Sequence, residues 1–457
     1  MLSHDPGLPV VQSIGEHCSL VLLGFALDWR EPTATNSQIL DGLAASASTF
    51  EECVALTADL GGRWAIIFRN SAESMIFHDA SGQRQICHTT PGTGERTWCA
   101  SEPMLLAEVA NLDEDASALA FIDRQESTNS EYFWPGDRTP YLNARSLLPN
   151  HALNIDDGTV QRFWPRQAHE NKPFDELVER IVARLKGTIN AASHRYSLAL
   201  GLSAGWDSRT LLAACNEAPG DLIAYSSRQP GMQADAPDLV IPKKLARMMD
   251  MQHELVDPPE NIDPDFNAQL QQHAWRPHQR FAAGMQGEYE KFKLARVAML
   301  GAIADFAKAP WRLSAADYSS LTGEAFATMV EMGDEEFAIV AHDEWLASIP
   351  EEYGYNVLDL FHWEMRHGRF LASNMVDFDF AWQDVLLPYN CRSQICDMLA
   401  CEEGKRTKED SQLSTEIIRR LSPRLLQVPI NPKLEPGIVA RIRRTLRHVS
   451  IKIGFRR

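Results

Sequence analysis

The sequence predicts two successive domains. Residues 1–168 are expected to form an α+β layered domain, and residues 169–457 an α/β domain with a parallel sheet and a helical C-terminal part. Three patterns predict this order: many short apolar runs with few helices up to residue 168, strands alternating with helices between residues 174 and 256, and mainly helical spacing beyond residue 314. At 457 residues the chain is long enough for two or three hydrophobic cores.

The composition is typical of a soluble globular protein, with 44% apolar and 23% charged residues. The net charge of −18 argues against a nucleic-acid partner, because neutralisation of phosphates dominates that affinity. No apolar run reaches the ~20 residues of a membrane span, and the N-terminus lacks a basic region followed by an apolar core. The eight scattered cysteines are therefore expected to be reduced thiols in a cytoplasmic protein.

Short strands and a few helices fill the first domain. Strands are predicted over residues 19–28, 63–68, 73–78 and 83–88, and helices over residues 38–45 and 50–58. Asn70 and Ser71 provide a hairpin turn between the second and third of these strands. This mixture is typical of an α+β layered domain.

A polar, proline-containing linker over residues 166–173 precedes the second domain. Helices are predicted over residues 174–193 and 238–249, and strands over residues 196–202, 222–226, 252–256 and 297–300. The alternation of strands and helices predicts a parallel sheet with helices on both faces. Ligands of such sheets bind at the carboxyl ends of the strands.

Residues 203–208, Ser-Ala-Gly-Trp-Asp-Ser, join the strand that contains Gly201 to a helix. A strand, a small-residue turn and a helix N-terminus form an anion site, because free backbone N–H groups and the positive end of the helix dipole converge there. Ser203 and Ser208 add hydroxyl donors. The carboxylate of Asp207 repels a phosphate unless Mg²⁺ lies between them, so the turn predicts a magnesium–polyphosphate site. The alternative is an ordinary turn with a Ser or Asp N-cap.

The same turn resembles the pyrophosphate loop of ATP pyrophosphatases, usually written Ser-Gly-Gly-x-Asp-Ser. Ser203, Gly205, Asp207 and Ser208 match this pattern, and Ala204 replaces the first glycine. The resemblance implies that ATP is cleaved between its α and β phosphates, giving an adenylated intermediate. It places ATP against these four residues and Gly201.

Three N-terminal motifs extend the resemblance: Leu-Gly-Gly-Arg at residues 60–63, Asp-Ala-Ser-Gly-Gln-Arg at residues 79–84, and Ser-Glu-Pro at residues 101–103. They resemble the glutaminase-like (Ntn-type) domain of the asparagine synthetase family. In active members the nucleophile is a cysteine exposed by removal of Met1, whereas residue 2 here is Leu2 and the nearest cysteine is Cys18. The fold is therefore expected without glutaminase activity, as in β-lactam synthetases and lasso-peptide cyclases.

A further family pattern, Ser-Gly-Glu-Gly-Ala-Asp-Glu, matches residues 300–306 in part. Gly301, Ala304 and Asp305 are retained, while Ala302 and Phe306 replace the two glutamates. The resemblance implies that Gly301 lies beside the adenosine and that Asp305 joins Asp207 as a second Mg²⁺–pyrophosphate carboxylate; the alternative for Asp305 is a helix N-cap. With Ala302, a carboxylate that could accept a proton from an attacking amine is missing.

Two basic segments follow. The family has a lysine near residues 404–408 that stabilises charge on the pyrophosphate; Lys405 and Lys408 both qualify as catalytic residues, and a solvated basic turn is the alternative. Eight of the last 25 residues are basic, with apolar residues at helical spacing. A basic amphipathic helix can contact an anionic membrane surface or a protein partner, and a packed terminal helix is the alternative.

The resemblance implies an ATP-dependent ligase that adenylates a carboxylate and releases pyrophosphate, after which an amine or free ammonia forms an amide. The expected substrates are small-molecule, peptide or saccharide carboxylates and amines. The alternative is a pseudo-synthetase that binds nucleotide or a partner without turnover, which the loss of the acid at Ala302 favours.

Overall fold

The computed structural model describes residues 2–94, 96–168, 172–229, 231–309, 311, 321–350, 353–408 and 410–432. Its first part contains a six-stranded antiparallel sheet in the order β1-β2-β3-β4-β8-β9. The strands are β1 (Val10–Ile14), β2 (Ser19–Asp28), β3 (Leu60–Arg69), β4 (Ser74–His78), β8 (His151–Asn154) and β9 (Val160–Arg162).

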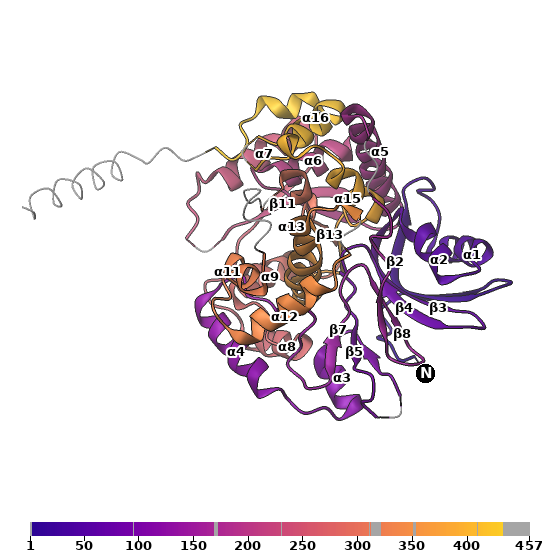
Figure 1. Cartoon of the computed structure of the whole chain (residues 1–457). Coiled ribbons are helices and arrows are strands. Elements are labelled where there is room, and N and C mark those ends of the chain that lie inside the picture. Colours follow the sequence, from indigo (N-terminus) through magenta and orange to yellow (C-terminus); the bar gives the residue numbers. More distant parts are fainter. Residues whose placement is uncertain are drawn as a thin grey trace, which may run out of the picture.

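Helices α1 (Asn36–Ser46) and α2 (Phe50–Thr57) cover one face of this sheet (Figure 1). Each begins with a capping box, in which Thr35 or Thr49 exchanges hydrogen bonds with the third residue of its helix. Phe50, Phe68 and Phe77 meet edge to face beneath them. The two helices and the four N-terminal strands thus enclose a core of their own.

A small second sheet lies beside the first and has the order β6-β5-β7. Its strands are β5 (Cys87–Thr89), β6 (Cys99–Ala100) and β7 (Ala144–Ser146), and it is accompanied by helices α3 (Pro103–Ala110) and α4 (Ala116–Thr128). Only the end of the strand predicted over residues 83–88 is present, as β5. Phe121 and Phe133 from this region share a buried core with Phe326 and Phe361, which lie far along the chain.

The second part contains a five-stranded parallel sheet in the order β12-β11-β10-β13-β14. Its strands are β10 (Leu198–Gly201), β11 (Leu222–Ser227), β12 (His253–Val256), β13 (Val297–Met299) and β14 (Asp384–Leu386). Helices α5 (Phe174–Ser193), α6 (Trp206–Ala214), α7 (Pro237–Met248), α8 (Pro264–His273) and α9 (Gln279–Phe292) alternate with the strands or flank them. The predicted fold class is confirmed: antiparallel layers, then a parallel sheet, then a helical C-terminal part.

Helices dominate the chain beyond β13 (Figure 1). They are α11 (Gly323–Met329), α12 (Glu336–Ala347), α13 (Val357–Phe361), a π-helix (His362–Leu371), α14 (Ala372–Asp379), α15 (Arg392–Leu399) and α16 (Gln412–Leu421). The π-helix was not expected, because its apolar residues fit ordinary helical spacing equally well. Among the described residues, no helix carries an apolar stretch long enough to cross a lipid bilayer.

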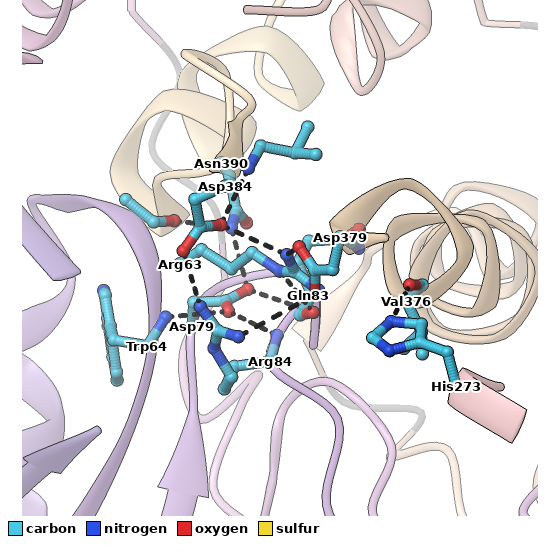
Figure 2. A network of polar contacts seen from close by, with 12 residues as sticks. Arg63, Trp64, Asp79, Gln83, Arg84, His273, Val376, Asp379, Asp384 and Asn390 are labelled. Atoms are coloured by element: carbon cyan, nitrogen blue, oxygen red, sulfur yellow. Dashed lines mark hydrogen bonds and ion pairs between the residues drawn. The ribbon is translucent and has the colours of Figure 1, made fainter. Parts of the chain in front are cut away.

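A buried ion-pair network joins the antiparallel part to the parallel sheet (Figure 2). Arg63 on β3 pairs with Asp379 at the end of α14 and, at 3.2 Å, with Asp384 on β14; Arg84 pairs with Asp384 at 3.0 Å. Asn390 donates to Asp79 Oδ1 at 2.8 Å. The two N-terminal motifs at residues 60–63 and 79–84 therefore form this junction.

Candidate functional site

The predicted turn lies at the carboxyl end of β10, the middle strand of the parallel sheet, and leads directly into α6. Gly205 is the N-cap of α6, and no described side chain caps that end of the helix. Backbone N–H groups of the first helical turn have no partner within the helix. The turn therefore presents uncapped donors and a positive helix end at the edge of the sheet where ligands bind.

Hydrogen bonds within the turn fix its shape. Ser203 N–H donates to Ser208 Oγ at 3.0 Å, and Gly205 N–H donates to Ser203 Oγ at 3.2 Å. Ala204 N–H donates to Asp238 Oδ1, at the start of α7, at 2.8 Å. The serine hydroxyls, 3.0 Å apart, thus hold the loop together.

Asp207 lies in the first turn of α6 and meets a lysine that the sequence did not single out. Lys308 Nζ donates to Asp207 Oδ2 at 2.6 Å, and Asp207 Oδ1 has no hydrogen-bond partner among the described residues. Burial raises the pKa of Asp207, Lys308 opposes this rise, and the charge of Asp305 adds to it. The pair places one cation and one free carboxylate oxygen beside the helix N-terminus.

Gly301 packs directly against this helix start. A Cβ at residue 301 would lie 2.9 Å from Asp207 C and 2.9 Å from Ser208 N, so only glycine fits. The next turn is strained, because the buried β-branched residue Ile303 has φ 72°. This turn leads into the 3₁₀ segment Ala304–Lys308, which carries both Asp305 and Lys308.

Among the described residues, no hydrogen bond or ion pair joins Asp305 to Asp207; the Asp305 carboxylate lies between two buried histidines of the π-helix. His362 Nε2 is 2.9 Å from Asp305 Oδ2, and His367 Nε2 is 3.0 Å from Asp305 Oδ1. Burial acts to raise the pKa of Asp305, but the two imidazoles outweigh it and hold the pKa well below the usual aspartate value. Neither histidine was a candidate from the sequence.

A buried arginine fastens the turn to the C-terminal segment. The Arg209 guanidinium donates to the carbonyls of Ala204 at 3.1 Å and Pro429 at 2.8 Å, and Asn431 N–H donates to the Ala204 carbonyl at 3.1 Å. Burial lowers the pKa of Arg209 to about 10. Residues 425–431 therefore form one wall of the loop.

The remaining predicted site residues lie as follows. Gly201 ends β10, where a Cβ would lie 2.9 Å from Leu300 Cδ2. Lys405 pairs with Glu402 at 3.3 Å, its Nζ lies 4.8 Å from the Phe174 ring centroid, and it lines a cavity of about 430 Å³. Lys408 is exposed. The structure brings neither lysine into a described contact with residues 203–208, and their catalytic role stays a prediction.

Two further sequence predictions concern the ends of the chain. Leu2 is exposed, and the Cys18 thiol is buried, donating to the Ala47 carbonyl at 3.3 Å. Burial raises the pKa of Cys18. The basic segment predicted for membrane or partner contact, residues 433–457, lies outside the described residues.

The residues missed from the sequence are Lys308, His362, His367 and Arg209. Lys308 lies three residues after Asp305, so its closeness to the motif at residues 300–306 could have marked it as a candidate site residue. The histidines are five residues apart, a spacing that puts two side chains on different faces of an α-helix. No local pattern marks Arg209, whose partners are backbone carbonyls distant in sequence.

No protein-family model and no curated protein matches this chain. Solved structures overlap with parts of it. They include the NH3-dependent NAD synthetase from Campylobacter jejuni (13% identity, 30% of this chain and 60% of that one, TM-score 0.21) and the U34-tRNA thiolase from Methanococcus maripaludis (12%, 57% and 83%, TM-score 0.23). Another is the glutamine phosphoribosylpyrophosphate amidotransferase from B. subtilis (14%, 71% and 61%, TM-score 0.22). The chain thus spans about 60% of the NAD synthetase and of the amidotransferase, and overlaps this slight carry no argument about function.

Proposed function

We propose that the chain is an ATP-dependent carbon–nitrogen ligase whose ATP site is the turn at residues 203–208. One observation carries the proposal: Asp207 and Lys308 lie together at the uncapped N-terminus of α6, at the carboxyl end of the middle strand of a parallel sheet. A nucleotide triphosphate needs backbone donors and a cation in one place, and this edge supplies both.

The residues here fit a magnesium nucleotide at Asp207. Its Oδ1 has no partner among the described residues and is free for a hard cation, which prefers oxygen ligands. Such an ion, when bound with ATP, offsets phosphate charge beside the carboxylate. Asp305, the expected second ligand, is engaged by His362 and His367, so the proposal rests on Asp207.

In the proposed reaction, a carboxylate oxygen of the substrate attacks the α-phosphorus, and the bond to the β-phosphate oxygen breaks. The N–H groups of α6 and the Lys308 ammonium stabilise the negative charge of the departing pyrophosphate. An amine or ammonia then attacks the acyl carbon, loses a proton and displaces AMP. Lys405 and Lys408 stay candidates for additional charge stabilisation.

A second candidate is a pseudo-synthetase that binds nucleotide or a partner without turnover. Ala302 stands where the resemblance expects a carboxylate, and Asp305 is turned to the histidines. The first observation favours loss of the amide-forming half of the reaction, and the second removes one expected carboxylate from the magnesium–pyrophosphate.

Nucleotide binding is tested by titrating the protein with Mg²⁺ and α,β-methylene-ATP, whose α–β bridge is not cleaved. Lys308→Met and Asp207→Asn are expected to weaken binding about tenfold or more, because a charged hydrogen bond contributes about 1.5–3 kcal/mol. The matched control is Lys291→Met, which breaks another 2.6 Å lysine–carboxylate pair, with Glu254, on β12. Equal affinity in all of these proteins contradicts the assignment of the ATP site.

Turnover is tested by ATP–pyrophosphate exchange with amino acids, other small carboxylic acids and peptides. Exchange that Asp207→Asn abolishes supports the ligase. Tight binding of the ATP analogue without exchange in any mixture favours the pseudo-synthetase.

A further inference from the structure

We propose that Asp305, His362 and His367 form a binding site for a divalent transition-metal ion, of which Zn²⁺ is the test case. The site is separate from the magnesium–nucleotide proposed at Asp207 and does not depend on the ligase activity. Each of the three residues offers one ligand atom, and these atoms all lie within 4.8 Å of one another.

The spacing of the atoms suits a shared ion. The imidazole nitrogens of His362 and His367 lie 2.9 and 3.0 Å from the two oxygens of Asp305. Two ligands at ~2.0–2.2 Å from one metal lie roughly 3.0–3.5 Å apart in octahedral or tetrahedral geometry. The two imidazole–carboxylate distances are close to this range, and the widest separation among the three ligand atoms, up to 4.8 Å, has to shorten when an ion binds.

A second observation concerns the ring nitrogens of the two histidines. His367 Nε2 lies 3.0 Å from Asp305 Oδ1, and the other ring nitrogen of each histidine, His362 Nδ1 and His367 Nδ1, is buried without a hydrogen-bond partner among the described residues. The His367 side chain is only 3% exposed. Two buried imidazoles whose ring nitrogens are hydrogen-bonded on one side at most, and which both point at one carboxylate, form a donor set that a metal ion can take up.

The local backbone supports the same conclusion. His362 and His367 are the first and sixth residues of the π-helix, whose i→i+5 hydrogen bonds bring this spacing onto one side. In an α-helix, residues five apart point about 140° from each other. π-helical turns are rare in proteins, and those that occur are often found at functional sites. Orienting both histidines toward Asp305 accounts for the presence of this one.

The donor set selects the kind of ion. Two imidazole nitrogens and one carboxylate oxygen suit Zn²⁺, Fe²⁺, Co²⁺ or Mn²⁺, whereas Mg²⁺ prefers oxygen ligands alone. The rings of Phe306 and Trp311 lie 5.4 and 4.8 Å from the His362 ring and surround it with aromatic carbon. Three protein ligands leave positions open for water or an anionic ligand.

The test begins with chelator-treated full-length protein, titrated with Zn²⁺ and separately with Mg²⁺ by calorimetry, with metal content measured after desalting. One Zn²⁺ per chain is expected, with no comparable retention of Mg²⁺. His362→Gln and His367→Gln should each weaken Zn²⁺ binding by at least about 100-fold, since even residues that only orient a ligand cost 10–100-fold. The matched control is His342→Gln, because His342 is also buried without ring hydrogen bonds among the described residues but lies outside the cluster.

A measurement on the unmodified chain covers the case in which a variant fails to fold. Histidine ring ¹⁵N resonances are recorded with and without one equivalent of Zn²⁺, and two histidines are expected to shift. Absence of Zn²⁺ binding, unshifted histidine rings, or binding unchanged in both cluster variants overturns the proposal. ATP-analogue binding that depends on Lys308 survives any of these results, so failure of the metal site and failure of the ATP site are distinguishable.

Discussion

Asp207 is the residue at which stability and the proposed function oppose each other. It is an acid at the start of a helix, where negative charge is favoured, and Lys308 pairs with it at 2.6 Å. Burial nevertheless raises its pKa, so the folded chain resists its ionisation. A carboxylate kept in such surroundings is better explained by a cationic ligand than by the stability of the fold.

This conflict predicts a pH-dependent effect of Asp207→Asn. As pH rises above ~3.9, the usual aspartate pKa, the unfolded chain ionises at residue 207 before the folded chain does. Residue 207 therefore lowers the stability of the native protein from that pH up to the raised pKa, and the amide variant lacks this contribution. Urea unfolding between pH 4 and 7 should show the stability difference moving in favour of the variant as pH rises.

Asp334→Asn, on the exposed surface, gives the control for simple loss of one negative charge. A stability difference for Asp207→Asn that is flat, or that falls with rising pH, contradicts the argument.

At the scale of elements, the site depends on how closely three segments approach. The N-terminus of α6, the turn after β13 and the π-helix carry Asp207, Gly301 and the two histidines, respectively. Gly301 permits the first contact, because its missing Cβ leaves room for the backbone of residues 207 and 208. The strained φ of Ile303 then orients the 3₁₀ segment that bears Asp305 and Lys308.

Gly301→Ala is expected to push the β13 turn away from α6. The added methyl would lie 2.9 Å from two backbone atoms that cannot rotate aside, and overpacking of this kind costs about 1–3 kcal/mol of unfolding free energy. The same substitution should weaken binding of the ATP analogue, because Asp207 and Lys308 lie on the two displaced segments. Urea unfolding and calorimetry measure the two effects.

Gly284→Ala is the matched substitution inside α9, where a Cβ would have no neighbour within 4 Å. It should leave nucleotide binding unchanged and stabilise the chain by about 0.5–1 kcal/mol. Equal unfolding free energies and equal affinities for the ATP analogue in the two alanine variants would contradict a functional close approach at Gly301.

At the scale of the whole molecule, the antiparallel and parallel parts are joined by charge as well as by apolar packing. Arg63 is buried in the junction, and its guanidinium forms ion pairs with both Asp379 and Asp384 (Figure 2). Arg84 is a second cation that pairs with Asp384. Phe121 and Phe133 also share a core with Phe326 and Phe361. The motifs at residues 60–63 and 79–84 thus have a structural use here, independent of glutaminase chemistry.

Arg63→Met should loosen this junction. Removing one partner of a buried ion pair leaves uncompensated carboxylates and costs about 3–5 kcal/mol, whereas Arg30→Met, which breaks the exposed pair with Asp59, should cost about 0–1 kcal/mol. In scanning calorimetry, the Arg63 variant is expected to unfold in two transitions, whereas the native chain is expected to unfold in one. A single unshifted transition would mean that the ion pairs do not couple the two parts.

The fold was more predictable than the site. The expected helix over residues 174–193 is α5 (Phe174–Ser193), and the strand expected over residues 19–28 is β2 (Ser19–Asp28), because their apolar periodicity is local and long. The strand expected over residues 83–88 is reduced to β5, because the Gln83 carbonyl accepts a hydrogen bond from Arg63 and Arg84 pairs with Asp384 in the charged junction. Lys308 and the two histidines reach the site through contacts between distant segments, which no periodicity encodes.

The sequence by itself determined the order of the layers, the turn between β10 and α6, and the chemistry of Asp207, since each depends on residues close together in the chain. Tertiary structure alone decided which cation meets Asp207 and that Asp305 lies between His362 and His367. The physical reason is that side-chain pairing follows distance in space. Lys308 is 101 residues from Asp207, and a π-helix, set by packing, turns a five-residue spacing into a shared face.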